Sequence, residues 1–188
     1  MPPLEKTFDC TYDATALAEL PSDRVERLYY PAASSEGGRD GMIVEVNPAR
    51  HTAWIGVFAF GDKGSRVISG LYSMPDPDSL CVVARGSGFV VNAHSPQLWS
   101  QVEAYPVIDV RSVFTLRIIL FVTYTAVVAY DSRGLRWRTG RLAWDGFDIV
   151  ELTNTHLKGR TRDPASDSML DFAVDLKDGS HQGGITEI

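Results

Sequence analysis

The stretch IILFVTYTAVVAYDSRGLRW, residues 118–137, decides the fold. Its first five residues are all apolar, a second apolar run follows at 127–130, and β-branched and aromatic residues fill both. Such runs are typical of buried strands. Asp131 to Gly134 then supply turn chemistry, because Asp bonds its own backbone and Gly accepts positive φ. We therefore predict two strands, a tight turn and a third strand at 135–139, all in one sheet.

Strand-like segments recur on the N-terminal side of this stretch, separated by turn residues such as Asn47-Pro48 and Ser95-Pro96. Many short strands at this spacing, without a long amphipathic helix, indicate an all-β fold that is mostly antiparallel. The expected strands lie at 42–46, 53–60, 66–72, 80–84, 88–92, 98–102 and 106–110.

The first 40 residues are the least regular part of the chain. Two short helices are expected there, at 14–20, where Pro21 ends the helix, and at 22–30. The segment 31–38 has the composition of a loop or linker. We therefore predict an irregular or helical N-terminal arm and linker over 1–40, and a single β domain over 41–188.

A shift of 38 residues aligns two apolar triplets and one tryptophan with their counterparts further along the chain. The aligned pairs are 82–84 with 120–122, 89–91 with 127–129, and Trp99 with Trp137. A shorter echo sets 173–179 beside 129–134. Two explanations stay open, a genuine internal repeat or chance agreement among β-rich segments.

Residues 120–138 resemble one blade of the repeats in pyrroloquinoline-quinone-type β-propellers. The shared pattern is two strands, an Asp-to-Gly turn, and a strand with a tryptophan three residues after the glycine. The resemblance implies structural roles, with Gly134 making the turn and Trp137 packing between sheets. It carries over no cofactor-binding residue.

Chain length bears on whether such sheets close into a ring. Four blades of about 40 residues each need roughly 160 residues, and the segment 41–188 is shorter than that. We therefore predict blade-like sheets arranged as an incomplete propeller or a β-sandwich, with self-assembly of two copies as a way to complete them.

Composition narrows the class of protein. A hydrophobic fraction of 44% with 22% charged residues is ordinary for a soluble globular protein, and the net charge of −6 argues against a nucleic-acid binder. No apolar run approaches the roughly 20 residues of a membrane helix, and the N-terminus carries no signal core. A cytoplasmic protein without a membrane partner is the expectation. Cys10 and Cys81 show no metal or redox spacing.

Charge is unevenly distributed near the C-terminus. Residues 111–162 hold nine basic and four acidic side chains, whereas 163–188 hold six acidic side chains and one lysine. Opposed segments of this kind can neutralise each other across adjacent strands.

Seven residues are the candidate ligand-binding set. Strand alternation places Arg136 and Arg138 on the face opposite Leu135 and Trp137, where they are suited to an anionic ligand. Nearby aromatic, acidic and imidazole groups suit stacking or acid–base chemistry. The full set is Arg136, Arg138, Arg141, Trp144, Asp145, Asp148 and His156.

No constellation of catalytic groups accompanies these residues. The four histidines lack metal spacing, no nucleophile motif is present, and no cofactor is implied. We therefore predict a non-catalytic domain that binds a small anionic ligand or a protein partner. Two alternatives stay open: a hydrolase acting on a carbohydrate or other polar ligand, and a structural protein that self-assembles into homo-oligomers through exposed strand edges.

Overall fold

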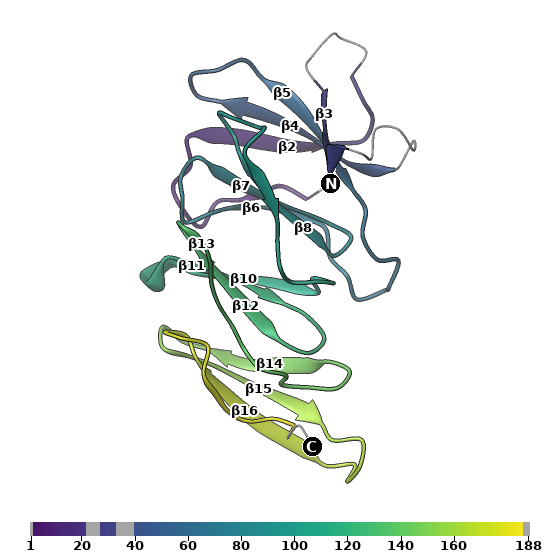
Figure 1. Cartoon of the computed structure of the whole chain (residues 1–188), viewed down its shortest axis with the longest axis vertical. Coiled ribbons are helices and arrows are strands. Elements are labelled where there is room, and N and C mark those ends of the chain that lie inside the picture. Colours follow the sequence, from purple (N-terminus) through teal and green to yellow (C-terminus); the bar gives the residue numbers. More distant parts are fainter. Residues whose placement is uncertain (1, 22–26, 33–39, 186–188) are drawn as a thin grey trace. The chain divides into compact units, whose positions relative to one another are not determined.

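Short strands make up the regular structure of this protein. The computed structural model describes residues 2–21, 27–32 and 40–185, and these form seventeen strands and a 3-10 helix at Phe114–Leu116 (Figure 1). The chain divides into two units, Met1–Val107 and Ile108–Ile188, called unit 1 and unit 2 below. No helix within the described residues is long and apolar enough to span a membrane.

Unit 1 contains two sheets, with strand orders β1-β6-β7-β8-β9 and β2-β4-β5-β3. Neighbouring strands are antiparallel except in the pairs β1–β6 and β3–β5, which are parallel. The strands are β1 (Leu4–Glu5), β2 (Tyr12–Leu17), β3 (Arg27–Tyr30), β4 (Gly41–Pro48), β5 (Trp54–Ala59), β6 (Gly70–Ser73), β7 (Ser79–Ala84), β8 (Ser87–Asn92) and β9 (Trp99–Gln101).

Unit 2 contains two four-stranded antiparallel sheets in which the strands follow one another in chain order. The first sheet is β10 (Asp109–Val113), β11 (Ile118–Val122), β12 (Val127–Asp131) and β13 (Gly134–Arg138). The second is β14 (Phe147–Leu152), β15 (His156–Arg162), β16 (Met169–Asp175) and β17 (His181–Gly183).

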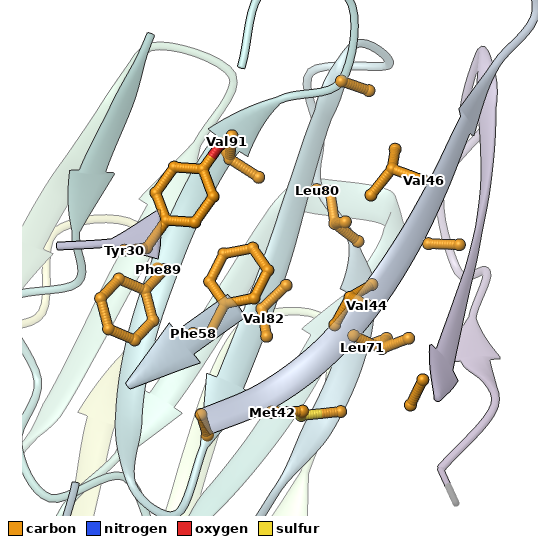
Figure 2. Packing of buried hydrophobic residues seen from close by; sticks show 14 of the residues in the cluster. Tyr30, Met42, Val44, Val46, Phe58, Leu71, Leu80, Val82, Phe89 and Val91 are labelled. Atoms are coloured by element: carbon orange, nitrogen blue, oxygen red, sulfur yellow. The ribbon is translucent and has the colours of Figure 1, made fainter. Parts of the chain in front are cut away.

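The core of unit 1 lies between its two sheets. Val44 and Phe58 of one sheet and Leu80 and Phe89 of the other are buried in one apolar cluster (Figure 2). The Tyr30 ring stacks on that of Phe58 with ring centroids 4.6 Å apart. Strand β3 is thereby attached to the cluster by side-chain packing as well as by its pairing with β5.

The core of unit 2 is also formed between two sheets. Leu120 and Ala129 of the first sheet share a buried cluster with Leu157 and Phe172 of the second. Trp137 belongs to the same cluster, so the tryptophan packs between sheets. Each unit is thus a pair of blade-like sheets joined by an apolar layer, and the predicted all-β, mostly antiparallel fold class is confirmed.

The stretch 118–137 folds as predicted. Ile119 pairs with Tyr130 across β11 and β12, and Asp131 pairs with Gly134 at the turn into β13. Gly134 has a φ of 111°, a value that favours glycine. All five residues of β11 are buried.

The segments aligned by the 38-residue shift lie in successive strands of two different sheets. The shift of 38 residues carries β7 onto β11, β8 onto β12 and β9 onto β13. Each trio is a consecutive antiparallel set within its own sheet. The shorter echo likewise aligns β16 and its following turn with β12 and its following turn.

The helix expected at 14–20 is wrong, because the segment contains strand β2. Tyr12, Ala14 and Ala16 are buried while Asp13 and Thr15 are exposed, a period of two that matches a strand. Pairing along β4 thus overrides the helical preference of the alanines.

The second expected helix, at 22–30, is also wrong over the part of this range that the structure describes. Residues 27–30 are strand β3, and 22–26 lie outside the described residues. The expected strand at 66–72 begins only at Gly70, and the one at 106–110 is shifted to Asp109–Val113. Whether 41–188 fold as a single domain stays a prediction.

Candidate functional site

The connection from β13 to β14 presents Trp144 and Asp145 on the surface of unit 2. The Leu142 N–H donates to the Thr125 carbonyl at 2.7 Å, and the Gly146 N–H donates to the Tyr124 carbonyl at 2.9 Å. Leu142 is fully buried. Because the segment is anchored on both sides, the residues between the anchors, Trp144 and Asp145 among them, are held in place.

The turn from β15 to β16 faces this connection. The Asp163 carboxylate accepts hydrogen bonds from the Ser166 hydroxyl at 2.5 Å and from the Ala165 N–H at 3.1 Å. The Ser166 hydrogen bond lowers the pKa of the Asp163 carboxyl, since it stabilises the ionised form. The Asp163 N–H closes the turn by donating to the Ser168 carbonyl at 2.8 Å.

A surface hollow of about 440 Å³, called the Trp144 hollow below, lies between the connection and the turn. The Thr161 hydroxyl donates to the Gly146 carbonyl at 3.1 Å and so ties the two walls together. Arg162 and Asp167 form an ion pair beside the hollow. The lining residues are Trp144, Asp145, Gly146, Arg162, Pro164 and Asp167.

Trp144 and Asp145 are the groups in this hollow that are open to a ligand. The Trp144 side chain is 46% exposed, and the Arg141 guanidinium carbon lies 4.8 Å from its ring centroid. Asp145 is exposed and makes no hydrogen bond or ion pair with another described residue. The hollow therefore offers an aromatic surface for stacking and a free carboxylate acceptor.

The predicted placement of Leu135 on the same sheet face as Trp137 is wrong. Tyr130 pairs with Leu135 while Ala129 pairs with Trp137, so Arg136 is an extra residue that forms a β-bulge. The bulge moves Leu135 to the face opposite Trp137 and leaves it exposed.

The two arginines also lie outside the Trp144 hollow. Arg136 donates to the Lys177 carbonyl at 3.3 Å. Arg138 is exposed on β13 and is not among the lining residues. The structure thus brings Arg141, Trp144 and Asp145 together and leaves Arg136 and Arg138 apart from them.

Asp148 and His156 are also placed elsewhere. Asp148 lies on β14 opposite Arg160 in the sheet register. His156 begins β15, whereas Arg162 of the hollow ends it. A seven-residue strand separates its ends by roughly 20 Å. His156 instead lines a smaller depression of about 270 Å³ together with Asp175 and His181.

Sequence reasoning missed the far wall of the hollow. Arg162 at the end of β15, and Pro164 and Asp167 in the turn after it, follow Trp144 by about twenty residues, and they reach it because β14 and β15 form a hairpin. The available signal was that Arg162 and Asp167, which carry opposite charges, lie on either side of a short turn. Residues on the two sides of a hairpin turn are neighbours in space.

The opposed charge segments neutralise each other on the last sheet. Arg160 pairs with Asp171 at 2.7 Å across β15 and β16. On the other side of β15, Lys158 pairs with Glu151 of β14 at 2.7 Å. The exposed face of this sheet is therefore a charge-compensated surface, and it lacks the convergent positive charge of an anion site.

A polar cluster in unit 1 brings together three residues distant in sequence. The Thr11 hydroxyl lies 2.5 Å from the Asp78 carboxylate and 2.7 Å from the His94 Nε2 atom. A carboxylate only accepts, so the single Thr11 proton points to Asp78 and Nε2 donates to Thr11. The His94 imidazole is thus not placed as a base for the Thr11 hydroxyl.

Comparison with known proteins assigns no family. No family model matches the chain, and no curated protein matches it. Two solved structures are similar: a complex of S. cerevisiae Dbp5 with Nup159, Gle1, IP6 and ADP, and the N-terminal domain of Nup159. In both, the identity is 13% and the TM-score 0.41, and the match covers 98% of this chain but 52% and 54% of those chains.

This chain therefore spans about half the length of the chains it matches. A likeness of this strength assigns neither an activity nor a partner. The resemblance of 120–138 to pyrroloquinoline-quinone-type blades stays a prediction. Within the described residues, no group of three or more His, Cys, Asp or Glu side chains is placed to hold a metal ion.

Proposed function

We propose that this chain is a non-catalytic protein-interaction domain that binds a short segment of a partner protein at the Trp144 hollow. The observation that carries the proposal is the half-exposed Trp144 ring, held on a doubly anchored loop beside a hollow. Tryptophan is enriched among the residues that dominate binding energy at protein interfaces. A rigid aromatic side chain also loses little conformational entropy on binding.

The openness of the walls favours a polypeptide over a small molecule. The Arg162 and Asp167 side chains are 69% and 72% exposed, respectively. Pockets for small ligands commonly bury about 70–90% of the ligand surface. A polypeptide that continues beyond the hollow satisfies its remaining polar groups outside it, so it tolerates an open site.

The chemistry of the hollow defines the segment that fits. Trp144 and Pro164 provide apolar contact for a proline or an aliphatic side chain, and the unpaired Asp145 carboxylate accepts from a lysine or arginine. We infer a segment in which an apolar residue lies next to a basic one.

A hydrolase and a domain that binds a small anionic ligand have weaker support. A glycosidase needs two acidic groups flanking the bond to be cleaved. Of the two carboxylates in the hollow, Asp167 is already ion-paired with Arg162. A small anionic ligand needs convergent cations, but Arg136 is bonded to Lys177 and Arg162 to Asp167.

A peptide library displayed on phage and selected against the intact protein tests the proposal. We expect the selected peptides to share an apolar–basic pair and to bind Trp144→Ala at least about tenfold more weakly, as for an interface hot spot. Asp145→Asn should weaken the basic peptides selectively.

The matched control is Val150→Ala, because Val150 is an exposed apolar residue of the same unit that does not line the hollow. Circular dichroism establishes that each variant is folded. Selected peptides that bind Trp144→Ala as tightly as the unaltered protein, or a selection that enriches no peptide, would overturn the proposal.

A further inference from the structure

Among the residues that the structure describes, strand β9 is an open edge of the first sheet in unit 1. It pairs with β8 on one side, and Trp99, Ser100 and Gln101 are all exposed. Segment 95–102 contains no charged residue. An exposed edge of this kind presents unpaired N–H and C=O groups to another strand.

The hydrogen bonds to β8 identify which backbone groups face outward. The Val102 N–H donates to Gly88, and the Leu98 carbonyl accepts from Asn92. Residues alternate along a strand, so positions 98, 100 and 102 face β8. The N–H and C=O groups of Trp99 and Gln101 therefore point to the free edge.

Four of the other edge strands carry features that block strand addition. β13 has the extra residue Arg136 and β14 the extra residue Val150, and both interrupt the register. On β2 the Asp13 carboxylate accepts from the Ala14 N–H at 3.0 Å. β17 ends at Gly183, whose φ is 74°. Bulges, edge charges and short strands are the usual means of protecting an edge, and β9 has only its shortness.

Apolar side chains accompany the open edge. Leu98 is 67% exposed and Trp99 is 37% exposed. The Trp99 ring also contacts the buried Tyr30 and Phe89 rings, with centroids 5.5 and 6.2 Å away. The strand is thus fixed to the core on one side and presents apolar surface on the other.

We propose that two copies of this chain pair antiparallel through β9, with a two-fold axis at Ser100. In this register Trp99 of one copy and Gln101 of the other exchange backbone hydrogen bonds, because both residues direct their N–H and C=O groups to the free edge. Leu98 lies opposite Val102 of the second copy. Ser100 faces its own counterpart as a non-hydrogen-bonded pair, in which side chains come closest.

Charge is the reason to assign a second copy as the occupant. A two-fold axis at Ser100 places position 100 against itself and every other residue against a different position of the same strand, so a charge at the axis would meet a like charge. The uncharged segment 95–102 avoids this, and Glu103 falls opposite Gln97. The edge is therefore self-complementary, and this pairing is independent of the Trp144 hollow.

Size-exclusion chromatography with light scattering on the full chain tests the pairing. We expect the unaltered protein to show twice the chain mass as concentration rises. Ser100→Lys alone and Ser100→Glu alone should each be monomeric, since like charges then meet at the axis. An equimolar mixture of the two variants should recover the dimer mass.

Two further variants keep the test decisive. Gln101→Pro removes an outward N–H without breaking a bond to β8, so it should yield a folded monomer by circular dichroism. Leu135→Lys introduces the same charge as Ser100→Lys, but at an exposed position of β13, so it should leave the dimer intact. A monomeric unaltered protein at all concentrations, dimeric single variants, or a mixture that stays monomeric would each overturn the pairing.

Discussion

The indole N–H of Trp137 donates a hydrogen bond to the Leu176 carbonyl at 3.1 Å, joining the two sheets of unit 2. Unit 1 has a matching bond, from the Trp54 indole to the Ala93 carbonyl at 2.9 Å. Both bonds are buried and connect residues 39 positions apart. Each pair of sheets is thus held by a directional polar contact within its apolar layer.

Trp137→Phe should destabilise the protein by about 1–3 kcal/mol, because the buried Leu176 carbonyl loses its partner while most of the ring volume is kept. Urea denaturation followed by circular dichroism measures the change. Trp144→Phe serves as the control, since Trp144 is half exposed and should shift stability by less than about 0.5 kcal/mol. Equal effects from the two changes would contradict the role of the hydrogen bond.

Gly159→Ala should cost about 1–3 kcal/mol through overpacking. A Cβ at this position would overlap the Phe172 ring, which lies across the glycine on the adjacent strand. Thermal and urea unfolding measure the loss. Combining the change with Phe172→Leu, which removes part of the ring, should cost less than the sum of the single changes. Simple additivity would show that the ring does not occupy this space.

Ser166→Ala should raise the pKa of the Asp163 carboxyl toward its ordinary value near 3.8, because the Ser166 hydroxyl is the main group that lowers it. A carboxyl with a depressed folded-state pKa adds stability above its unfolded pKa and loses it as the pH falls through the folded value. The order of the 163–168 turn should therefore decline below about pH 4. Carbon-detected NMR titration of the Asp163 carboxyl tests the shift, and an unchanged pKa in the variant would refute it.

Native protein should expose one reactive thiol. Burial raises the pKa of the Cys81 thiol well above its usual range, so the reactive thiolate is disfavoured there. Cys10 is only partly buried. Reaction with a coloured disulfide reagent should release one equivalent from the folded protein and two in denaturant. Cys10→Ser should abolish the fast reaction, and rapid labelling of that variant would show that Cys81 is accessible.

Local composition was sufficient for much of the fold. In 118–137 the apolar runs, the turn from Asp131 and the glycine at 134 all favour the same structure, and the strands form there as predicted. The agreement arises because burial on both faces requires apolar residues at every position. The place of Trp137 between sheets was implied by the resemblance to propeller blades and not by composition, and the residue lies in the cluster that joins the two sheets.

Strand β15 shows where composition was insufficient. Its residues alternate between exposed and buried, but Gly159 and Thr161 occupy two of the three buried positions, so no hydrophobic alternation is visible. The Phe172 ring of the next strand fills the space above the glycine. The apolar contact thus comes from a neighbour, which a pattern read along one strand does not reveal.

The sequence by itself determined the all-β class, the strands and turn of 118–137, and Trp144 and Asp145 as neighbouring candidate binding residues, because these depend on residues close together in the chain. Tertiary structure alone decided which groups join them. The bulge at Arg136 and the hairpin that brings Arg162 and Asp167 beside Trp144 depend on strand register. Register is a property of paired segments, since a shift of one residue reverses the face of every side chain.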